Sequence, residues 1–312
     1  MNGGRDIMTE TAKKEWVGFS PNRVWQIAAN TFTESVRQKV FYVLLVFALV
    51  VIACVLFFRQ FDFGEEFKFV KDFCLGAISI FGTCIAIVGT SMLLPNEVEH
   101  RTIYTILSKP VRRFEFLFGK YVGSLLLVFV STVLMSLMFG VVLYVMMIFS
   151  EGRARAEMSH GAAGAEVHQD AAAHAEETAA LGQTLQKIRA EAMDPDIVKG
   201  VLLIFVKLCV LAAVTLAIST ISTSMVFNVV VSFMVFIAGH LVGPTREKWG
   251  EIAAARWALA IIPDFGMFNV ADDIVLGNAI PWLHTLKVVL YGVVYVGCLV
   301  AAAHFVFENR EI

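Results

Sequence analysis

The chain has 312 residues, of which 58% are hydrophobic and 17% are charged, and its formal net charge is -2. Soluble domains carry about a quarter charged residues, whereas here the apolar residues gather in blocks long enough for a helix to cross about 30 Å of hydrocarbon. This composition excludes an ordinary soluble protein. Because no basic run or aromatic-rich basic patch occurs, we also expect no nucleic-acid partner.

The polar segment 1–39 precedes the first apolar block and contains an amphipathic pattern. Asn22 can cap a helix, and Val24, Ile27 and Phe32 share one helical face. Basic residues on the other face suit a lipid headgroup surface. The pattern predicts a cytoplasmic N-terminus with an interfacial helix that leads into the first span.

Six apolar blocks follow within 40–312. Lipid leaves only helices or closed barrels as spanning structures, so we predict an all-α integral membrane protein with six transmembrane helices. An even number of spans places both termini on one side, and the density of Lys and Arg favours the cytoplasm for that side. The predicted spans are 40–58, 73–94, 121–149, 200–220, 224–242 and 283–305.

A short charged stretch, "PNEVEHRTIYTILSKPVRR", occupies 95–113 between the second and third spans. Asn96 can cap a helix, Glu97 and Glu99 suit its positive start, and Lys109 suits its negative end. Pro110 ends the helix after about three turns. The pattern predicts either a short helix at the cytoplasmic membrane surface or an ordinary interfacial loop.

The segment 150–198 after the third span is a polar insertion on the predicted extracytoplasmic side. It is rich in Ala, Glu and Gln, which favour helix, so we expect a projecting helix or a partly ordered arm. Its His160, His168 and His174 raise the hypothesis of a metal site. Their spacings of eight and six residues do not place all three on one helical face, so we expect no bound metal.

The segment 243–282 between the fifth and sixth spans is too polar and too interrupted to cross the membrane. Irregular backbone at membrane depth persists only where protein covers it. We therefore expect short re-entrant or interfacial helices on the outer side, bounded by Pro263 and Pro281.

Polar residues inside the spans form two stripes, one on the fifth span and one on the sixth. Such residues are costly in lipid and usually face a bundle interior or a cavity. They line a translocation pathway, or they make interhelical hydrogen bonds and, near span ends, snorkel to the headgroups. The pathway candidates are Asn228, Ser232, His240, Tyr291 and Tyr295, with His284, Lys287 and Lys207 as expected snorkellers.

Catalytic motifs do not occur in the chain. It lacks the GxxxxGK[ST] loop that cradles nucleotide phosphates, and it lacks HExxH and GxSxG. The sequence Asn96–His100 fails the HxxEH metalloprotease pattern, because position 96 is not histidine. We therefore expect no enzyme activity and no cofactor in this chain.

The loop residues Glu97, Glu99 and Thr102, followed by "ILSKPVRRFEFLFGK", resemble the first cytoplasmic loop of ABC transporter permeases of the type-2 export group. The stretches "TFTESVRQKVFYVLLVFALVVI", "IIPDFGMFNV" and "FENREI" are similar to the same family, in the same order. More narrowly, they resemble permeases of multicopper-enzyme maturation systems. The insertion 150–198 departs from the short connection usual in the family.

The resemblance implies a six-helix permease of the bacterial inner membrane that pairs with a second copy or a homologue. Two cytoplasmic ATP-binding subunits would bind Mg-ATP and drive transport, most often export, of a substrate that the sequence does not identify. In this family the loop at 95–113 is a coupling helix that docks on the ATPase. The docking residues carried over are Glu97, Glu99, Arg101, Thr102, Lys109 and Pro110.

Two rival functions remain at this point. One is a membrane-embedded assembly or scaffold protein without transport activity. The other is a passive channel, although no acidic ring or carbonyl filter motif supports it. An ATPase that purifies with the chain would favour the transporter.

Overall fold

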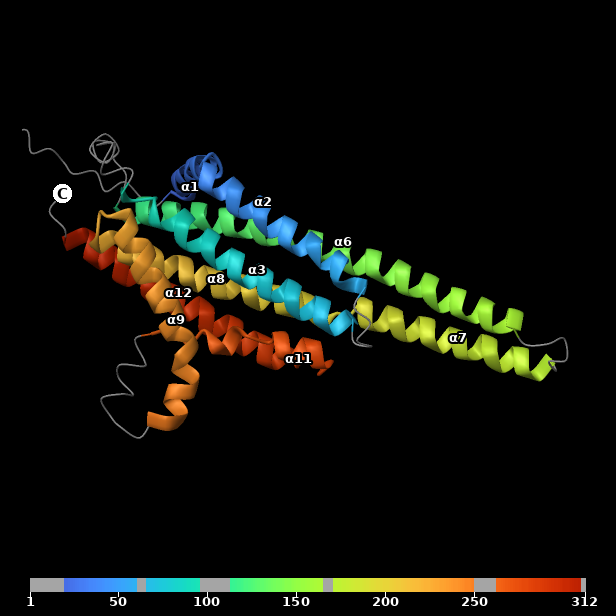
Figure 1. The fold of residues 1–312 in the computed structure, drawn as a ribbon. Coiled ribbons are helices and arrows are strands. Elements are labelled where there is room, and N and C mark those ends of the chain that lie inside the picture. The colour runs from blue at the N-terminus through green and yellow to red at the C-terminus, as the bar shows by residue number, and fades with distance from the viewer. Residues whose placement is uncertain (1–19, 61–65, 96–112, 165–170, 250–261, 310–312) are drawn as a thin grey trace, which may run out of the picture.

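The computed structural model describes residues 20–60, 66–95, 113–164, 171–249 and 262–309, and the secondary structure of these residues is entirely helical (Figure 1). The helices pack into one elongated bundle. In chain order they are α1 (Pro21–Val36), α2 (Lys39–Cys54), η1 (Val55–Gln60), α3 (Glu66–Ser91), α6 (Arg113–Gly164), α7 (Ala171–Ala192), α8 (Asp196–Ile221), α9 (Met225–Trp249), η2 (Gly266–Phe268), α11 (Ala271–Leu276) and α12 (Trp282–Asn309).

Six helical segments of the described residues are long and apolar enough to cross a membrane, which confirms the predicted number. The α8 segment is central, because α8 packs against α3, α6, α9 and α12. The segments are Lys39–Phe57, Glu66–Ser91, Arg113–Ala156, Thr178–Ile221, Met225–Arg246 and Trp282–Glu308.

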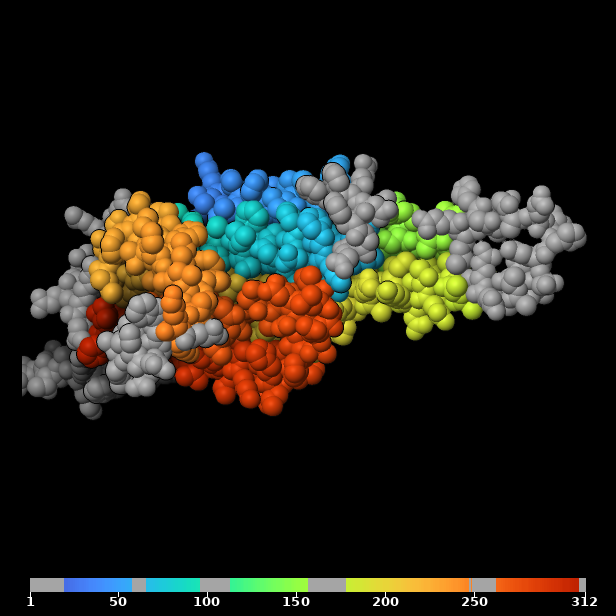
Figure 2. Space-filling model, turned by 60° about the horizontal axis from the view of Figure 1, so that its bottom comes forward, coloured from blue at the N-terminus to red at the C-terminus, as the bar shows by residue number. Residues whose placement is uncertain are grey.

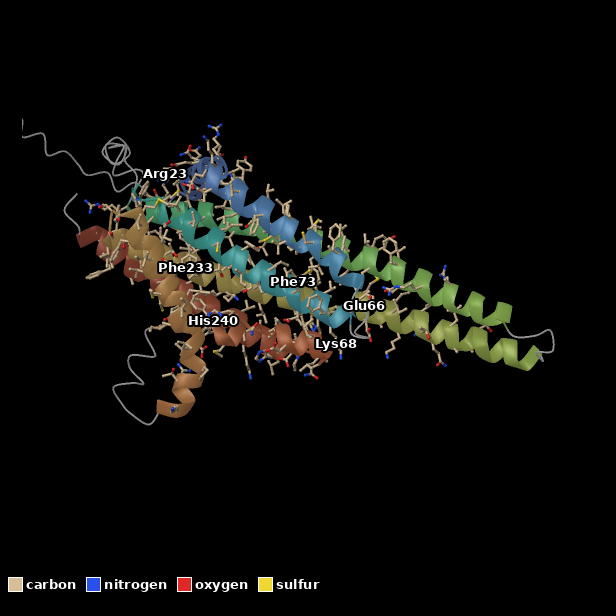
Figure 3. All side chains as sticks on the ribbon, in the orientation of Figure 1. Arg23, Glu66, Lys68, Phe73, Phe233 and His240 are labelled. Carbon is tan, nitrogen blue, oxygen red and sulfur yellow. The ribbon has the colours of Figure 1, made fainter. Side chains whose placement is uncertain are left out.

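The two ends of the bundle differ in what they carry. At one end lie α1, the start of α6 and the C-terminal end of α12; we call it the terminal end (Figure 1). At the other, α6 and α7 project beyond the remaining helices as an antiparallel hairpin; we call it the hairpin end. Figure 3 shows Arg23 near the first end, Glu66 near the second and His240 between them.

The insertion 150–198 takes the projecting-helix form of the two that the sequence allowed. The third span continues without a break to Gly164, and α7 returns alongside it. Ion pairs hold the base of the hairpin. Arg189 pairs with Glu151 across the two helices at 2.6 Å, and Arg153 reaches Glu66 of α3 at 3.0 Å.

Several helices extend beyond the predicted spans, and that of the third span begins at Arg113, ahead of 121. The helix of the second span begins at Glu66, ahead of 73, because its charged first turns have partners: Lys71 pairs with Asp194 at 3.1 Å, and Glu66 pairs with Arg153. The helix of the fifth span continues past 242 to Trp249, with Pro244 inside it. A proline removes one backbone hydrogen bond and bends a helix without necessarily ending it.

Two short helices follow the fifth span between the two predicted prolines. η2 and α11 lie against α9, α3 and α8. Figure 2 views the face where α3 (cyan), α9 (orange) and the α11–α12 region (orange-red) lie next to one another. The short helices lie within the segment 243–282, as its sequence predicted. Their re-entrant character stays a prediction.

Candidate functional site

A cavity of about 270 Å³ lies inside the bundle where α3, α8 and α9 meet the segment 268–274. Its apolar wall includes Leu75, Ile204, Phe268 and Ile274. Its polar residues come from four separate elements: Asp72 and Ser79 of α3, Lys207 of α8, His240 of α9, and Asn269 and Asp272 around the start of α11. Pockets with mostly apolar walls and a few convergent polar groups are the usual form of small-molecule sites.

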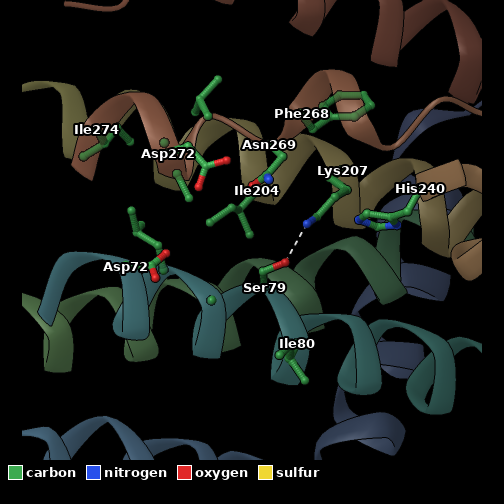
Figure 4. Close-up of a pocket in the computed structure, with 15 residues that line it drawn as sticks. Asp72, Ser79, Ile80, Ile204, Lys207, His240, Phe268, Asn269, Asp272 and Ile274 are labelled. Atoms are coloured by element: carbon green, nitrogen blue, oxygen red, sulfur yellow. Dashed lines mark hydrogen bonds between the residues drawn. The ribbon is translucent and has the colours of Figure 1, made fainter. Parts of the chain in front are cut away.

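Lys207 is the charged group at the centre of this cavity (Figure 4). It is 3% exposed, and its Nζ donates a hydrogen bond to Ser79 Oγ at 2.5 Å. Among the described residues no carboxylate lies within 4.0 Å of Nζ. The expectation that Lys207 snorkels towards the headgroups was therefore wrong, because its side chain turns into the bundle and not towards lipid.

His240 of α9 lines the cavity, and the glycine before it lets another segment approach that helix. A Cβ on Gly239 would lie 2.6 Å from the carbonyl oxygen of Pro263 and 2.4 Å from the Phe265 ring. The Phe265 N–H donates to the carbonyl oxygen of Gly239 at 3.1 Å. His240 Nδ1 lies 3.0 Å from the carbonyl oxygen of Phe236, which can only accept, so Nδ1 carries the proton and Nε2 is left for other contacts.

The mouth of the cavity is acidic. Asp72 and Asp272 line it and are exposed, as is Asn269. Figure 4 shows the two carboxylates towards one end of the cavity and His240 towards the other. The cavity therefore has a buried cationic side and an open anionic side.

A buried ion pair at the hairpin end fixes the segment that closes the cavity. Lys199 Nζ donates to Asp196 Oδ1 at 2.5 Å and to the carbonyl oxygen of Ile280 at 2.8 Å. Asp196 Oδ2 accepts the Ile280 N–H at 3.0 Å. Both polar groups of the Ile280 backbone are thus satisfied by one helix, which holds the 262–281 segment on α8.

At the terminal end, α1 is attached to the first turns of α6 through a carboxylate. Glu115 is fully buried, and its Oε1 accepts the Ser20 N–H at 2.9 Å. Its Oε2 lies 3.6 Å from Arg23 Nη1. Since Ser20 immediately precedes α1, the carboxylate holds both the start of that helix and its first basic side chain.

Two glycines bring the same helices into direct contact. A Cβ on Gly119 would lie 2.8 Å from Ile27 Cβ, and one on Gly123 would lie 2.8 Å from the carbonyl oxygen of Ala28 and 2.6 Å from Thr31 Cβ. Spacing of four residues between small residues is the usual device for close helix packing in membranes. We call Ser20, Arg23, Glu115, Gly119 and Gly123 the α1–α6 clamp.

The start of α6 is also held by the end of the chain. Arg113 Nη1 donates to the carbonyl oxygens of Phe307, at 3.4 Å, and Glu308, at 2.9 Å. Cationic side chains suit the negative end of a helix, where carbonyl groups lack helical partners. α1, α6 and α12 are thus joined at the point where α6 begins.

The predicted docking residues Glu97, Glu99, Arg101, Thr102, Lys109 and Pro110 lie outside the described residues. The structure describes the helices on either side of them, since α3 ends at Ser91 and α6 begins at Arg113. Their docking role stays a prediction.

The predicted pathway residues separate into different surroundings. His240 lines the cavity, whereas Asn228 and Ser232 are fully buried elsewhere on α9. The Asn228 amide donates to the carbonyl oxygen of Ser222 at 3.3 Å. Tyr291 Oη accepts the Asp264 N–H at 3.1 Å, and its ring lies 5.6 Å from that of Tyr295. A pathway role for these residues stays a prediction.

The predicted metal candidates are not brought into a described site. His168 lies outside the described residues, and nothing is described of the side chains of His160 and His174. Within the described part of the chain, no group of three or more His, Cys, Asp or Glu side chains could hold a metal ion.

Several site residues were missed by the sequence analysis. Asp72, Ser79 and Asp272 are ordinary polar residues in sequence, and only the fold brings them to Lys207. Glu115 precedes an apolar block and gave no signal of burial. The G-x-x-x-G spacing of Gly119 and Gly123 was the one signal that could have indicated a helix contact.

The chain is similar to a known protein family over most of its length. A family model described as ABC-2 family transporter protein matches residues 25–312. The chain therefore belongs to the ABC-2 transporter family and is a multi-pass membrane permease of an ABC transporter. Proteins of this family are components of membrane transport rather than enzymes. A search of curated proteins found none that matches the chain.

Proposed function

We propose that this permease transports its substrate with ATP that a separate subunit hydrolyses, and that the subunit docks at 96–112. The observation that carries the proposal is the family match over 25–312. The lack of a P-loop in the chain agrees with hydrolysis elsewhere. Mg-ATP would bind to the partner, which places that cofactor outside this chain.

The connections at the terminal end support this docking position. The segment 96–112 joins α3, which contacts the cavity, to α6, which the clamp ties to α1 and Arg113 ties to α12. A force applied at 96–112 would therefore be transmitted to four helices: α3, α6, α1 and α12. Protein cores shift between packed arrangements and do not deform continuously, so a rigid attachment at this point suits coupling.

The proposal has further parts, which family membership supports. The substrate moves outwards, two permease chains pair in the membrane, and the membrane is the bacterial inner membrane with both termini in the cytoplasm. Apolar side chains on α9 and α12 are widely exposed, among them Phe227, Met234, Leu286 and Leu290. Such faces require lipid or a second permease chain as their surroundings.

Co-purification tests the proposal. The tagged chain is isolated from its native host in mild detergent, and the ATPase activity of the eluate is measured. We expect an ATP-binding subunit in the eluate, and we expect Glu97→Lys with Glu99→Lys to remove it. The control is Glu191→Lys with Asp273→Lys, because these two exposed carboxylates belong to α7 and α11, and 96–112 joins two other helices, α3 and α6.

The outcomes separate the alternatives. If wild-type chain purifies with no ATPase, the proposal fails and the scaffold function becomes the better one. If the control pair removes the ATPase as completely as the Glu97 and Glu99 pair, the docking position at 96–112 is wrong.

A further inference from the structure

The cavity around Lys207 has the features of a binding site whose occupant carries charge. A lysine buried at membrane depth loses its hydration, and that loss is costly unless partners replace water. Within the described part of the chain, its Nζ donates one hydrogen bond, to the neutral hydroxyl of Ser79. Because a hydroxyl does not balance the charge, the open space next to Nζ calls for an anionic group.

Lys207 lies too deep in the bundle for its ammonium group to reach the water or lipid headgroups at either end of α8. It lies eight residues after Lys199, which is about 12 Å along α8, and fourteen residues before Ile221, which is about 21 Å. Neither end of the helix is therefore within reach of the Nζ. The side chain faces the cavity, as Figure 4 shows, and its neighbours there include the apolar Ile204.

The mouth of the cavity adds a second requirement. A molecule that enters passes Asp72 and Asp272, and both are exposed. A simple anion is repelled by two carboxylates before it reaches the lysine, whereas a simple cation is attracted to the mouth and repelled inside. A molecule with both charges meets an opposite charge at each position.

We propose that the cavity binds a small zwitterionic molecule, with its anionic group at Lys207 and its cationic group towards Asp72 and Asp272. This site rests on the proposed function only in that the bound molecule is taken to be the transported substrate. The anionic group completes the partners of Nζ, and the apolar walls cover the middle of the molecule.

The distance between the cationic and the anionic end of the cavity narrows the class of ligand. Asp72 precedes Ser79 by seven residues, which is about 10 Å along α3. The two charges of the ligand therefore lie several ångströms apart, which is the case in an ω-amino acid or a short peptide. In an α-amino acid both charged groups are attached to the same carbon atom, so they cannot reach both ends of the cavity.

A matched series of probes tests the proposal on the full chain in lipid nanodiscs. The probes are 6-aminohexanoate, hexanoate and hexylamine, which share a carbon chain and differ only in charge. Binding is measured by equilibrium dialysis with radiolabelled probe. We expect saturable binding of 6-aminohexanoate, with hexanoate and hexylamine at least about tenfold weaker. Hexanoate leaves the carboxylates of the cavity mouth without a cation, and hexylamine leaves Lys207 without an anion.

Variants locate the binding. Lys207→Met removes the central cation, and we expect it to abolish measurable binding of 6-aminohexanoate. Lys287→Met is the control, because Lys287 is an exposed lysine on α12 outside the cavity. Asp72→Asn with Asp272→Asn removes the acidic mouth, and we expect hexanoate then to bind about as well as 6-aminohexanoate.

Three results would overturn the site: no saturable binding of any probe, equal binding of all three, or unchanged binding in Lys207→Met. None of these depends on the ATP-binding partner. If wild-type chain binds 6-aminohexanoate but purifies without an ATPase, the transporter function fails and the zwitterion site stands. If an ATPase co-purifies and no probe binds, the site fails and the transporter function stands.

Discussion

The α1–α6 clamp and the Lys207 cavity each contain a buried charged side chain, and the surroundings of the two charges differ. Glu115 accepts a backbone hydrogen bond from Ser20 and lies beside Arg23, where Gly119 and Gly123 let α1 pack closely on α6. Lys207 donates to one hydroxyl and faces open space. The carboxylate of the clamp thus has an opposite charge beside it, whereas the cavity leaves room for a further group next to Lys207.

This difference indicates that the two regions have different roles: the clamp transmits movement, and the cavity binds a ligand. A region that transmits movement benefits from tight packing, because close-packed atoms transmit displacement directly. A region that takes up a ligand needs space and unsatisfied polar groups. Four substitutions test the contrast, in order of decreasing effect on the free energy of unfolding.

The largest effect is expected for Gly123→Leu. The new side chain meets the Ala28 carbonyl oxygen and Thr31 Cβ, and no rotamer avoids backbone, so α1 is displaced at a cost of about 3 kcal/mol. Thermal and denaturant unfolding in detergent micelles measure the loss. Gly140→Leu is the control on the same helix, because a Cβ at Gly140 meets nothing within 4 Å. Equal losses in the two variants would contradict the clamp.

Glu115→Ala comes next. The Ser20 N–H loses its partner and Arg23 loses its neighbouring carboxylate, so we expect roughly 2 kcal/mol of destabilisation. The same unfolding experiment, with Glu308→Ala as an exposed control, measures it. A loss no larger than that of the control would mean that the carboxylate does not hold α1.

Two glycines on α3 allow a packed position and an open position to be compared within one helix. A Cβ on Gly82 would lie 2.6 Å from Leu208 Cδ1, while Gly76 lines the cavity and has nothing within 4 Å. We expect Gly82→Ala to destabilise by about 1 kcal/mol, since Leu208 can shift in part. Gly76→Ala should be neutral or slightly stabilising, because alanine favours helix. The reverse order in unfolding experiments would show that the cavity is not open at Gly76.

The smallest effect is expected for Lys207→Met. Replacing an unbalanced buried charge with an apolar side chain of similar length is often neutral or stabilising, and Ser79 can bond to its own helix. We expect the free energy of unfolding to change by less than about 1 kcal/mol while binding of 6-aminohexanoate is lost. A loss as large as that of Glu115→Ala would mean that Lys207 is a structural residue like those of the clamp.

Sequence alone predicted the spans well and the site poorly, and the reasons differ. Each span is a local block of apolar residues, and its need for about 20 such residues comes from membrane thickness. The helix ends at Glu66 and Trp249, which lie beyond the predicted spans, depended on partners or on a tolerated proline. His240 was singled out as a polar residue within a span, which is again a local property.

The amino-acid sequence by itself determined that this chain crosses the membrane as six helices and that the insertion favours helix without deciding between a projecting helix and a partly ordered arm, because hydropathy and helix propensity act over neighbouring residues. Tertiary structure alone decided that Lys207 faces Ser79 instead of lipid, that Asp72 and Asp272 share its cavity, and that Glu115 holds α1. These contacts join residues far apart in the chain. Their existence depends on which face of each helix meets its neighbour, and that choice is made only when the bundle packs.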